Sequence, residues 1–195
     1  AIISAMIVQK KDLAHQIDLA KQNKCRVAVG GPFATSTPEA EELKAVDYLV
    51  LDEGEITLPM LVEALGKGAK TGTFTAEGEK PDLSASPVPR FDLLDRHDYA
   101  MMAVQFSRGC PFQCEFCDII VLYGRKPRTK TPLQLIRELE SLYKLNWRGE
   151  IFLVDDNFIG NKRSVKLLLG ELATWQKRHS YPFSFTTEAS IDLAS

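Results

Sequence analysis

Residues 107–118 read Ser-Arg-Gly-Cys-Pro-Phe-Gln-Cys-Glu-Phe-Cys-Asp, and this stretch holds three of the chain's four cysteines. The spacing Cys110-x3-Cys114-x2-Cys117 puts three thiols on one loop, where they can converge on a single inorganic centre. Thiolates are soft ligands that suit an iron–sulfur cluster, zinc or copper(I). A cubane cluster has one more iron than this loop has cysteines. That open iron can bind a substrate or cofactor, much as a catalytic zinc keeps an open position.

A structural zinc site is the main alternative for these cysteines. Such sites usually take four ligands, often as two cysteine pairs. The sequence has no second pair, and the nearest histidine before Cys110 is His97. A disulfide is disfavoured because three cysteines leave one unpaired. Ligand number and spacing therefore favour the iron–sulfur cluster over zinc.

Composition excludes several classes of protein. The 195 residues are 45% hydrophobic with mixed charge, which is typical of a globular chain with one large domain or two small ones. A net charge of -2 provides no basic field, so we expect no nucleic-acid partner. No apolar run approaches the ~20 residues of a membrane span. Thiols and an implied cluster fit a reducing, cytoplasmic location.

The cysteine loop resembles that of the radical S-adenosylmethionine (SAM) enzymes. Pro111 after the first cysteine and the aromatic Phe116 before the last also match the loop of that family. The resemblance implies a [4Fe-4S] cluster on Cys110, Cys114 and Cys117, whose open iron chelates the amino and carboxylate groups of SAM. It further implies that SAM is cleaved reductively to a 5'-deoxyadenosyl radical, and that Phe116 lies against the adenine.

In the first part of the chain, short apolar runs alternate with helical patterns. We predict strands at residues 2–8, 26–29 and 48–51. Helices are predicted at residues 12–21 and 59–65, and another from Ser36, which has a capping hydroxyl followed by a proline. Residues 71–76 are predicted to form a short hairpin strand. Strands that alternate with helices imply a parallel sheet with ligands at the carboxyl ends of its strands.

This part of the chain resembles the later part of the cobalamin-binding domain that precedes many radical SAM domains. Residues 4–6 correspond to its Ser-x-Leu turn with methionine for leucine, and residues 30–31 to its Gly-Gly turn. Residues 53–55 match the end of a Gly-Glu-Gly-Glu element. The alternative is that these glycines only make tight turns. The resemblance implies cobalamin contacts at Ser4, Gly30, Gly31, Glu53 and Gly54.

The Asp-x-His-x-x-Gly motif, whose histidine ligates cobalt in methionine-synthase-like domains, is absent. Many radical SAM members lack that histidine, so its absence does not decide whether cobalamin binds. His15 falls on a predicted helix and is interpreted as a solvated residue, not as a cobalt ligand.

After the connector, a strand at 102–106 runs into the cysteine loop, and further strands are predicted at 150–154 and 183–187. Thr131 begins a helix with a capping box, and a second helix has a predicted buried face of Val165, Leu168, Leu169, Leu172 and Trp175. The radical SAM fold is a partial barrel of six strand–helix units. The resemblance implies that this chain covers about the first half.

Polar residues follow two of these strands. Sites in such barrels lie at the carboxyl ends of the strands, so the residues belong to one rim. Asp155, Asp156 and Asn157 stand where the family commonly has a Gly-Gly-Glu element that binds the SAM amino group, which leaves open which of the three makes the contact. Glu188 is a further expected partner of SAM or substrate. Helix capping is the alternative role for all four.

Four basic residues lie between positions 123 and 130, next to the expected SAM site. A solvated loop is one interpretation. The other is contact with an anionic substrate or with an acidic electron donor of the flavodoxin or ferredoxin type.

The expected fold class is α/β. Residues 1–68 are interpreted as the C-terminal part of a doubly wound, Rossmann-like cobalamin-binding domain. Residues 69–100 form a connector, and residues 101–195 form the N-terminal half of a radical SAM partial (β/α)6 TIM-like barrel. The chain opens inside a predicted strand and closes at residues 191–195, where a helix is expected to begin. We therefore interpret it as a fragment of a longer protein.

The expected activity is cobalamin-dependent methylation of an unactivated carbon in a small-molecule or lipid substrate. The cysteine loop and the strand end at residues 155–158 also resemble the subgroup that includes hopanoid methylases. Two alternatives stay open, a rearrangement or cyclisation without methyl transfer and a non-catalytic, cluster-binding fragment. Radical methylthiotransferases carry further cysteines upstream, whereas here Cys25 is the only other one.

Overall fold

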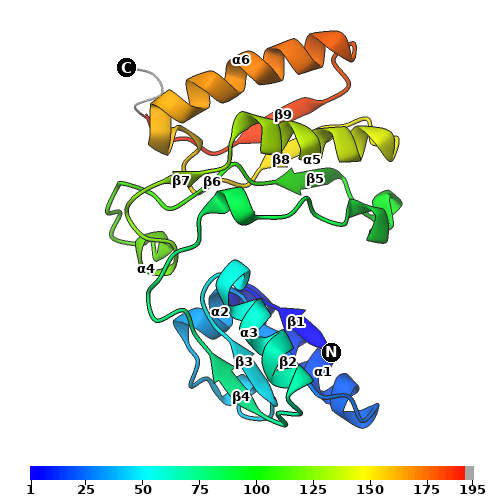
Figure 1. Cartoon of the computed structure of the whole chain (residues 1–195), viewed down its shortest axis with the longest axis vertical. Coiled ribbons are helices and arrows are strands. Elements are labelled where there is room, and N and C mark those ends of the chain that lie inside the picture. The colour runs from blue at the N-terminus through cyan, green and yellow to red at the C-terminus, as the bar shows by residue number, and fades with distance from the viewer. Residues whose placement is uncertain (192–195) are drawn as a thin grey trace. The chain divides into compact units, whose positions relative to one another are not determined.

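The computed structural model describes residues 1–191 and divides the chain into two compact units, residues 1–81 and a second unit that begins at Asp82 (Figure 1). Each unit is built on a parallel sheet with helices between successive strands. The helix expected at residues 191–195 falls almost wholly outside the described residues.

The sheet of the first unit has four parallel strands in the order β1-β2-β3-β4. Ile2 lies opposite Ala28, which lies opposite Tyr48, which lies opposite Gly72. Because all strands run the same way, their carboxyl ends meet at one edge. In chain order, with 3₁₀ helices labelled η, the elements are β1 (Ile2–Ser4), η1 (Ile7–Gln9), α1 (Lys10–Gln22), β2 (Ala28–Gly30), α2 (Pro32–Ser36), η2 (Glu41–Leu43), β3 (Tyr48–Val50), α3 (Gly54–Gly66) and β4 (Gly72–Phe74).

Both faces of this sheet are covered, as a doubly wound sheet requires. On one face, Leu13 and Ile17 of α1 pack in a core with Val29 of β2. On the other, Leu61 of α3 packs in a core with Ala28 of the same strand. Successive side chains of a strand point to opposite faces, so a three-residue strand serves both cores.

Three details of the first unit differ from the sequence prediction. The strand predicted at 2–8 ends at Ser4, because its partner β2 ends at Gly30, and residues 7–9 form η1 with Val8 86% exposed. The helix predicted to begin at Ser36 is wrong, because Ser36 is the last residue of α2. Helix α2 begins at Pro32, directly after Gly31 turns the chain with φ +87°. The hairpin predicted at 71–76 is also wrong, because β4 pairs parallel to β3.

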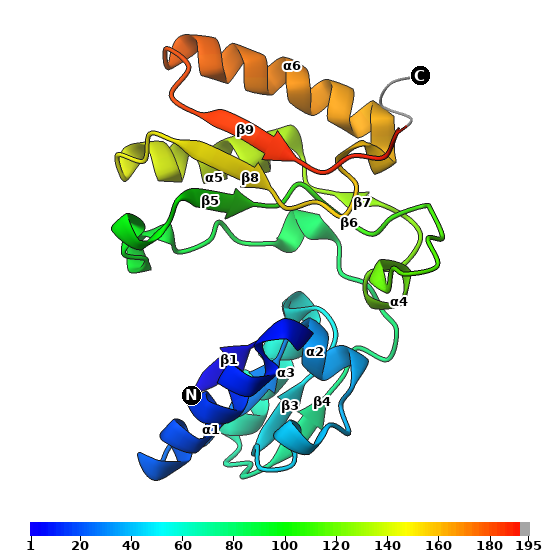
Figure 2. The same cartoon turned by 180° about the vertical axis from the view of Figure 1, so that it is seen from behind.

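The second unit has a three-stranded parallel sheet, β5-β8-β9, and a two-stranded antiparallel ribbon, β6-β7. Helices α5 and α6 pack together with the three-stranded sheet (Figures 1 and 2). In chain order the elements are η3 (Leu83–Ala85), η4 (Phe91–Leu93), η5 (Arg96–Asp98), β5 (Met101–Val104), β6 (Ser107–Arg108), α4 (Ile119–Leu122), β7 (Arg128–Thr129), α5 (Pro132–Lys144), β8 (Glu150–Leu153), η6 (Phe158–Asn161), α6 (Lys162–Arg178) and β9 (Ser184–Thr187).

The start of α5 is confirmed as predicted. Thr131 and Gln134 form a reciprocal capping box, with Pro132 at the first helical position. The apolar faces of α5 and α6 form one core with β5, β8 and β9. One residue of the predicted α6 face is wrong: Leu169 is 48% exposed, because it lies beside the buried stripe and not on it.

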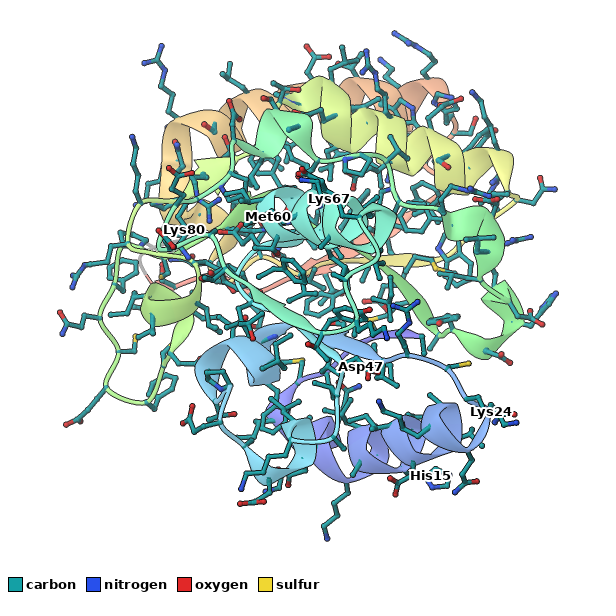
Figure 3. The ribbon with its side chains drawn as sticks, turned by 60° about the horizontal axis from the view of Figure 1, so that its bottom comes forward. His15, Lys24, Asp47, Met60, Lys67 and Lys80 are labelled. Carbon is teal, nitrogen blue, oxygen red and sulfur yellow. The ribbon has the colours of Figure 1, made fainter. Side chains whose placement is uncertain are left out.

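Asp47 joins α1 to the sheet of the first unit, and it is labelled in Figure 3. Its Oδ2 accepts hydrogen bonds from Lys21 Nζ at 2.6 Å and from the Val27 backbone N–H at 2.7 Å. The hydrogen bond from Lys21, followed by that from Val27, holds the pKa of Asp47 below its ordinary value. A carboxylate with a lowered folded pKa contributes stability above its unfolded pKa, and this contribution is lost as pH falls through the folded pKa.

We therefore expect Asp47→Asn to destabilise the first unit by about 1–3 kcal/mol at neutral pH, the cost of weakening hydrogen bonds to a charged group. Hydrogen exchange of residues 1–81 measures this loss, with Asp18→Asn on the exposed face of α1 as the control. The difference from the wild-type protein should shrink as pH falls below the ordinary aspartate value of about 4 and through the lowered pKa of Asp47, where the wild-type side chain also becomes neutral. A difference that stays constant on acidification would contradict the role of the charge.

Candidate functional site

The cysteine loop leaves the sheet of the second unit after β5, and its two ends are paired with each other. Chain leaving β5 enters β6, and Ser107 and Arg108 pair with Thr129 and Arg128 of β7, so the ribbon ties the two ends of the loop together. The Cys110 backbone N–H donates to the Gly124 carbonyl at 3.2 Å, which extends this closure toward the cysteines.

All three cysteines of the loop are free thiols, with Cys110 and Cys117 half-buried and Cys114 exposed. The Cys117 backbone N–H donates to the Cys114 carbonyl at 3.1 Å, so these two residues lie in one turn. Within residues 1–191, no three His, Cys, Asp or Glu side chains converge closely enough to hold a metal ion. Three sulfurs on one loop are soft donors of the kind that suit an iron–sulfur cluster.

Asp155, directly after β8, is buried, with 2% of its surface exposed. Its Oδ2 accepts from the Phe106 backbone N–H at 3.2 Å, and its Oδ1 accepts from both the backbone N–H and the hydroxyl of Ser107. Burial raises the pKa of Asp155, and the hydrogen bonds and the charge of Lys130 oppose that rise. The carboxylate thus fixes the chain where it leaves β5.

Asp156 holds the next part of the same segment. Its Oδ2 accepts from the Gly109 backbone N–H at 3.0 Å. Burial raises the pKa of Asp156, with the Gly109 hydrogen bond acting in the opposite direction. Two consecutive acidic residues therefore bind the residues that lead to Cys110.

Gly109 is itself closely confined. Its φ is +92°, and a Cβ there would lie 2.8 Å from the Gly124 carbonyl oxygen, 3.1 Å from that of Lys126 and 3.2 Å from that of Tyr123. Gly124 has a similar φ of +85°, but among the described residues, its chain neighbours aside, no atom lies within 4 Å of its Cβ position. Alanine substitutions at the two glycines therefore separate the energetic cost of a left-handed backbone from the cost of crowding around the new Cβ atom.

We expect Gly109→Ala to destabilise the second unit by about 1–3 kcal/mol more than Gly124→Ala, the usual cost of forcing an atom into packed structure. Both variants bear the left-handed penalty of about 1–2 kcal/mol. The chain's two tryptophans, Trp147 and Trp175, both lie in the second unit, so denaturant unfolding followed by their fluorescence reports on it. Equal losses in the two variants would contradict the crowding at Gly109.

Asn157 approaches the first cysteine directly. It is 3% exposed, and its Nδ2 lies 4.0 Å from Cys110 Sγ and 3.1 Å from the Ser190 hydroxyl. Its Oδ1 accepts from the Ser190 backbone N–H at 3.2 Å. This asparagine therefore links the end of β8, the segment after β9 and the cysteine loop.

Two predicted SAM residues have side chains that make no such contacts with the part of the chain that the structure describes. Phe116 is 93% exposed and extends from the loop. Glu188 is exposed, and its backbone carbonyl accepts from the Phe158 N–H at 2.9 Å, which joins the end of β9 to η6. The structure brings Asp155, Asp156 and Asn157 to the cysteine loop, whereas it leaves the side chains of Phe116 and Glu188 in solvent.

The basic run contains a buried charge that the sequence prediction missed. Lys130 is 6% exposed, and its Nζ lies 2.5 Å from Oε1 of Glu138, which is 2% exposed. The other oxygen of Glu138 has no hydrogen-bond partner among the described residues. Burial raises the pKa of Glu138, although the charges of Lys130 and Arg108 oppose the rise. Lys130 thus belongs to neither the solvated loop nor an exposed anion-binding surface.

A sequence signal for this pair does exist. Glu138 falls between Leu135 and Leu139 on the apolar face of α5, where a charge needs a partner. The identity of that partner depends on the fold, since Lys130 reaches the helix through the ribbon: its N–H donates to the Phe106 carbonyl at 2.8 Å.

In the first unit, the predicted cobalamin residues gather at the carboxyl ends of three adjacent strands. Ser4 ends β1, Gly30 ends β2, and a Cβ on Gly31 would lie 2.4 Å from Ser4 Oγ. A Cβ on Gly30 would lie 2.7 Å from the Val50 carbonyl oxygen. Only glycine allows these backbones to approach so closely.

Glu53 and Gly54 follow β3 at the same edge and start α3. Glu53 is 4% exposed, and its Oε1 lies 4.0 Å from Nζ of Lys80, which is labelled in Figure 3. His15 is exposed on α1, as predicted, and it is labelled in the same view.

Comparison with known proteins identifies relatives along nearly the whole chain. An uncharacterized methyltransferase of Synechocystis is 63% identical over 193 residues, which cover 99% of this chain and 36% of that protein. The hopanoid C-2 methylase of Rhodopseudomonas palustris is 36% identical over 202 residues, which cover 98% of this chain and 37% of the methylase. The chain belongs to the B12-binding radical SAM methyltransferase family. No family model matches the chain.

The fold agrees with this family. The structure of TsrM, a radical S-adenosylmethionine methyltransferase from Kitasatospora setae, superposes with a TM-score of 0.69 at 18% identity. The match covers 88% of this chain and 37% of TsrM. The α/β prediction with parallel sheets is confirmed to that extent. The chain spans slightly more than a third of the length of these three proteins. Among the residues described, no helix has the length and apolar character to cross a membrane.

Proposed function

We propose that this chain is part of a cobalamin-dependent radical SAM enzyme that methylates an unactivated carbon of a small-molecule or lipid substrate. The observation that carries the proposal is the 36% identity with a hopanoid C-2 methylase over 98% of the chain. The cysteine loop, which is the part of the chain most closely tied to radical chemistry, lies inside the matched region.

In this proposal Cys110, Cys114 and Cys117 are the protein ligands of a [4Fe-4S] cluster. Three free thiols on a loop closed by the β6-β7 ribbon suit such a group, because soft sulfur ligands hold iron–sulfur clusters. When bound, the cluster supplies the electron that splits the sulfonium of SAM into methionine and a 5'-deoxyadenosyl radical.

The residues around the loop are proposed to bind and orient SAM. Phe116, exposed on the loop, offers its ring to the adenine. Polar groups for the amino acid part of SAM come from the strand ends, where Asp156, Asn157 and Glu188 lie, whereas Asp155 is buried against the backbone of residues 106 and 107. Asn157 has an amide next to Cys110 Sγ, and Glu188 has an exposed carboxylate.

Cobalamin is proposed to bind the first unit, where it would act as the methyl carrier. Ser4, Gly30 and Gly31 present bare backbone at the ends of β1 and β2, and Glu53 and Gly54 add the end of β3. Ligands of open parallel sheets bind at this edge, outside the carboxyl ends of the strands. Gly31 lacks space for a side chain, so the backbone is the surface that a cofactor tail meets.

The electron donor is proposed to be an acidic protein of the flavodoxin or ferredoxin type, in a reducing cytoplasm. Arg125 and Lys126 are exposed on the cysteine loop and give it local positive charge. Arg125 also donates to Gln113 Oε1 at 2.7 Å, which links the basic residues to the cysteine segment. Opposite charges of this kind steer encounter.

The test is anaerobic reconstitution with iron and sulfide, followed by dithionite reduction and EPR with and without SAM. We expect a reduced cubane signal that SAM perturbs, because SAM binds the open iron. Cys25→Ser is the matched control: Cys25 is exposed and distant from the loop in sequence, so the variant should behave as wild type. Zinc uptake without an EPR signal, or a signal indifferent to SAM, would overturn the proposal.

Cobalamin is tested separately by titration followed by visible absorption. Gly31→Val should weaken binding, because a side chain there meets Ser4 and the Ala5 backbone. Gly68→Val is its control, since Gly68 also has positive φ, +81°, but has open space around its Cβ position. Equal binding by both variants would contradict the proposed cobalamin contact at Gly31.

A further inference from the structure

The segment before the first cysteine is held by carboxylates that come from another strand. Residues 106–109 connect β5 with Cys110, and three of their backbone N–H groups donate to Asp155 or Asp156. The Ser107 hydroxyl is a fourth donor. These acidic residues follow β8, the neighbour of β5, and the Val154 N–H donates to the Val104 carbonyl at 2.9 Å just before them. Hydrogen bonds thus connect the segment that follows β8 to the segment that follows β5.

The carboxylate of Asp155 uses three of its four acceptor sites to bind this segment. An ionised carboxylate only accepts, with two lone-pair sites on each oxygen. Oδ1 accepts two hydrogen bonds from Ser107, Oδ2 accepts one from Phe106, and the residue is 2% exposed. A SAM amino group approaching from the cysteine side would find neither free acceptors on Oδ1 nor an accessible surface.

We propose that Asp155 and Asp156 are positioning residues: they bind the backbone of residues 106–109 and so set the place of the Cys110 thiol, and Asp155 does not contact SAM. The claim about SAM rests on the proposed function. The claim about the Cys110 thiol does not, because it concerns the protein without a cluster.

Burial raises the pKa of both carboxylates, and the charges around them act in both directions. Lys130 is buried beside the ribbon, and its charge favours the ionised form of Asp155. Arg108 acts in the same direction on Asp156. Facing them, Glu138, the neighbouring aspartate and Asp118 contribute opposing negative charge. A neutral polar residue would avoid this repulsion, but it would lose acceptors that the backbone N–H groups need.

The decisive variant is Asp155→Asn. Both carboxylate oxygens receive N–H donors, so an amide of the same shape must place its NH₂ group against one of them. Losing a hydrogen bond to a charged group in a buried site favours local opening about tenfold or more. The probe is site-resolved alkylation of the iron-free protein by iodoacetamide, read by mass spectrometry. Cys110 is half-buried and Cys114 exposed, so Cys110 should react more slowly in the wild-type protein.

We expect Asp155→Asn to raise the alkylation rate of Cys110 about tenfold and to leave Cys25 unchanged, since Cys25 lies in the first unit. Asp156→Asn should give a smaller rise, because its amide oxygen can still accept the single hydrogen bond from Gly109. Asp98→Asn, an exposed aspartate of η5, is the matched control. If Asp155→Asn unfolds the unit, Ser107→Ala is the alternative test. It removes only the hydroxyl donor and should still raise the alkylation rate of Cys110. An unchanged Cys110 rate in folded variants would overturn the positioning role.

A second readout separates this inference from the proposed function. In reconstituted protein, Asp155→Asn should lower iron loading and shift the g-values of the cluster, while the SAM concentration that half-perturbs the remaining signal stays within about twofold of wild type. Normal loading with a SAM requirement raised tenfold or more would mean that Asp155 contacts SAM, and the inference would be wrong. Failure of the wild-type protein to form a cluster would overturn the proposed function and leave the alkylation test valid.

Discussion

Replacing Cys110 with serine is expected to abolish the SAM-sensitive EPR signal and to reduce SAM cleavage to the level of protein that has not been reconstituted. Serine keeps the shape of the side chain but removes the soft thiolate that binds iron. Iron bound per chain should fall from about four toward zero. The same result is expected for Cys114→Ser and Cys117→Ser, because each cysteine holds a different iron of the cubane.

Cys25→Ser is the control, because it also removes one thiol. It should retain both the EPR signal and SAM cleavage. We expect the loop variants to stay folded, since Cys114 is exposed and Cys110 is half-buried. Tryptophan fluorescence checks this directly, because both tryptophans lie in the second unit. Retention of a SAM-sensitive signal in any of the three loop variants would show that the loop does not ligate the cluster.

The features that the sequence predicts best are local ones. The spacing of Cys110, Cys114 and Cys117 lies within one loop, and the capping box of α5 lies within four residues, so both are visible in the sequence alone. The alternation of strands and helices also predicted two parallel sheets correctly, because crossover connections require parallel neighbours.

The features that the sequence missed depend on residues far apart in the chain. The carboxylate of Asp155 meets Ser107 across 48 positions, and Asp156 meets Gly109 across 47. The sequence places acidic residues at a strand end but does not say whether they face a ligand or a neighbouring backbone. The strand predicted at residues 2–8 was too long for another reason. An apolar run predicts burial, but the length of a strand is set by its partner strand, which here ends at Gly30.

Replacing Lys130 with methionine is expected to destabilise the second unit by about 3–5 kcal/mol at neutral pH, the usual cost of removing one partner of a buried ion pair. Glu138, 2% exposed, would lose its 2.5 Å contact with Lys130, and its other oxygen already has no hydrogen bond within residues 1–191. Denaturant unfolding followed by tryptophan fluorescence measures the loss. Lys126→Met, an exposed lysine of the same loop, is the control and should change stability by less than about 0.5 kcal/mol.

The pH dependence identifies the cause. The folded pKa of Glu138 is raised by burial, and Lys130 opposes the rise, so the methionine variant should raise that pKa further. An acid whose folded pKa exceeds its unfolded pKa contributes stability that is fully present below the unfolded pKa and is lost as pH rises through the folded pKa. The deficit of Lys130→Met relative to wild type should therefore be larger at pH 8 than at pH 5.

A double variant separates the buried charge from lost packing. Lys130→Met with Glu138→Leu replaces the ion pair by apolar side chains, an exchange that is often neutral or stabilising, so it should recover most of the loss. It should also remove the part of the pH dependence that Glu138 causes. The remaining deficit measures what Lys130 contributes to Asp155, whose ionised form its charge also favours. A double variant as unstable as Lys130→Met alone would mean that Glu138 is not the source of the penalty, and that the lysine acts mainly through the aspartate that holds the cysteine loop.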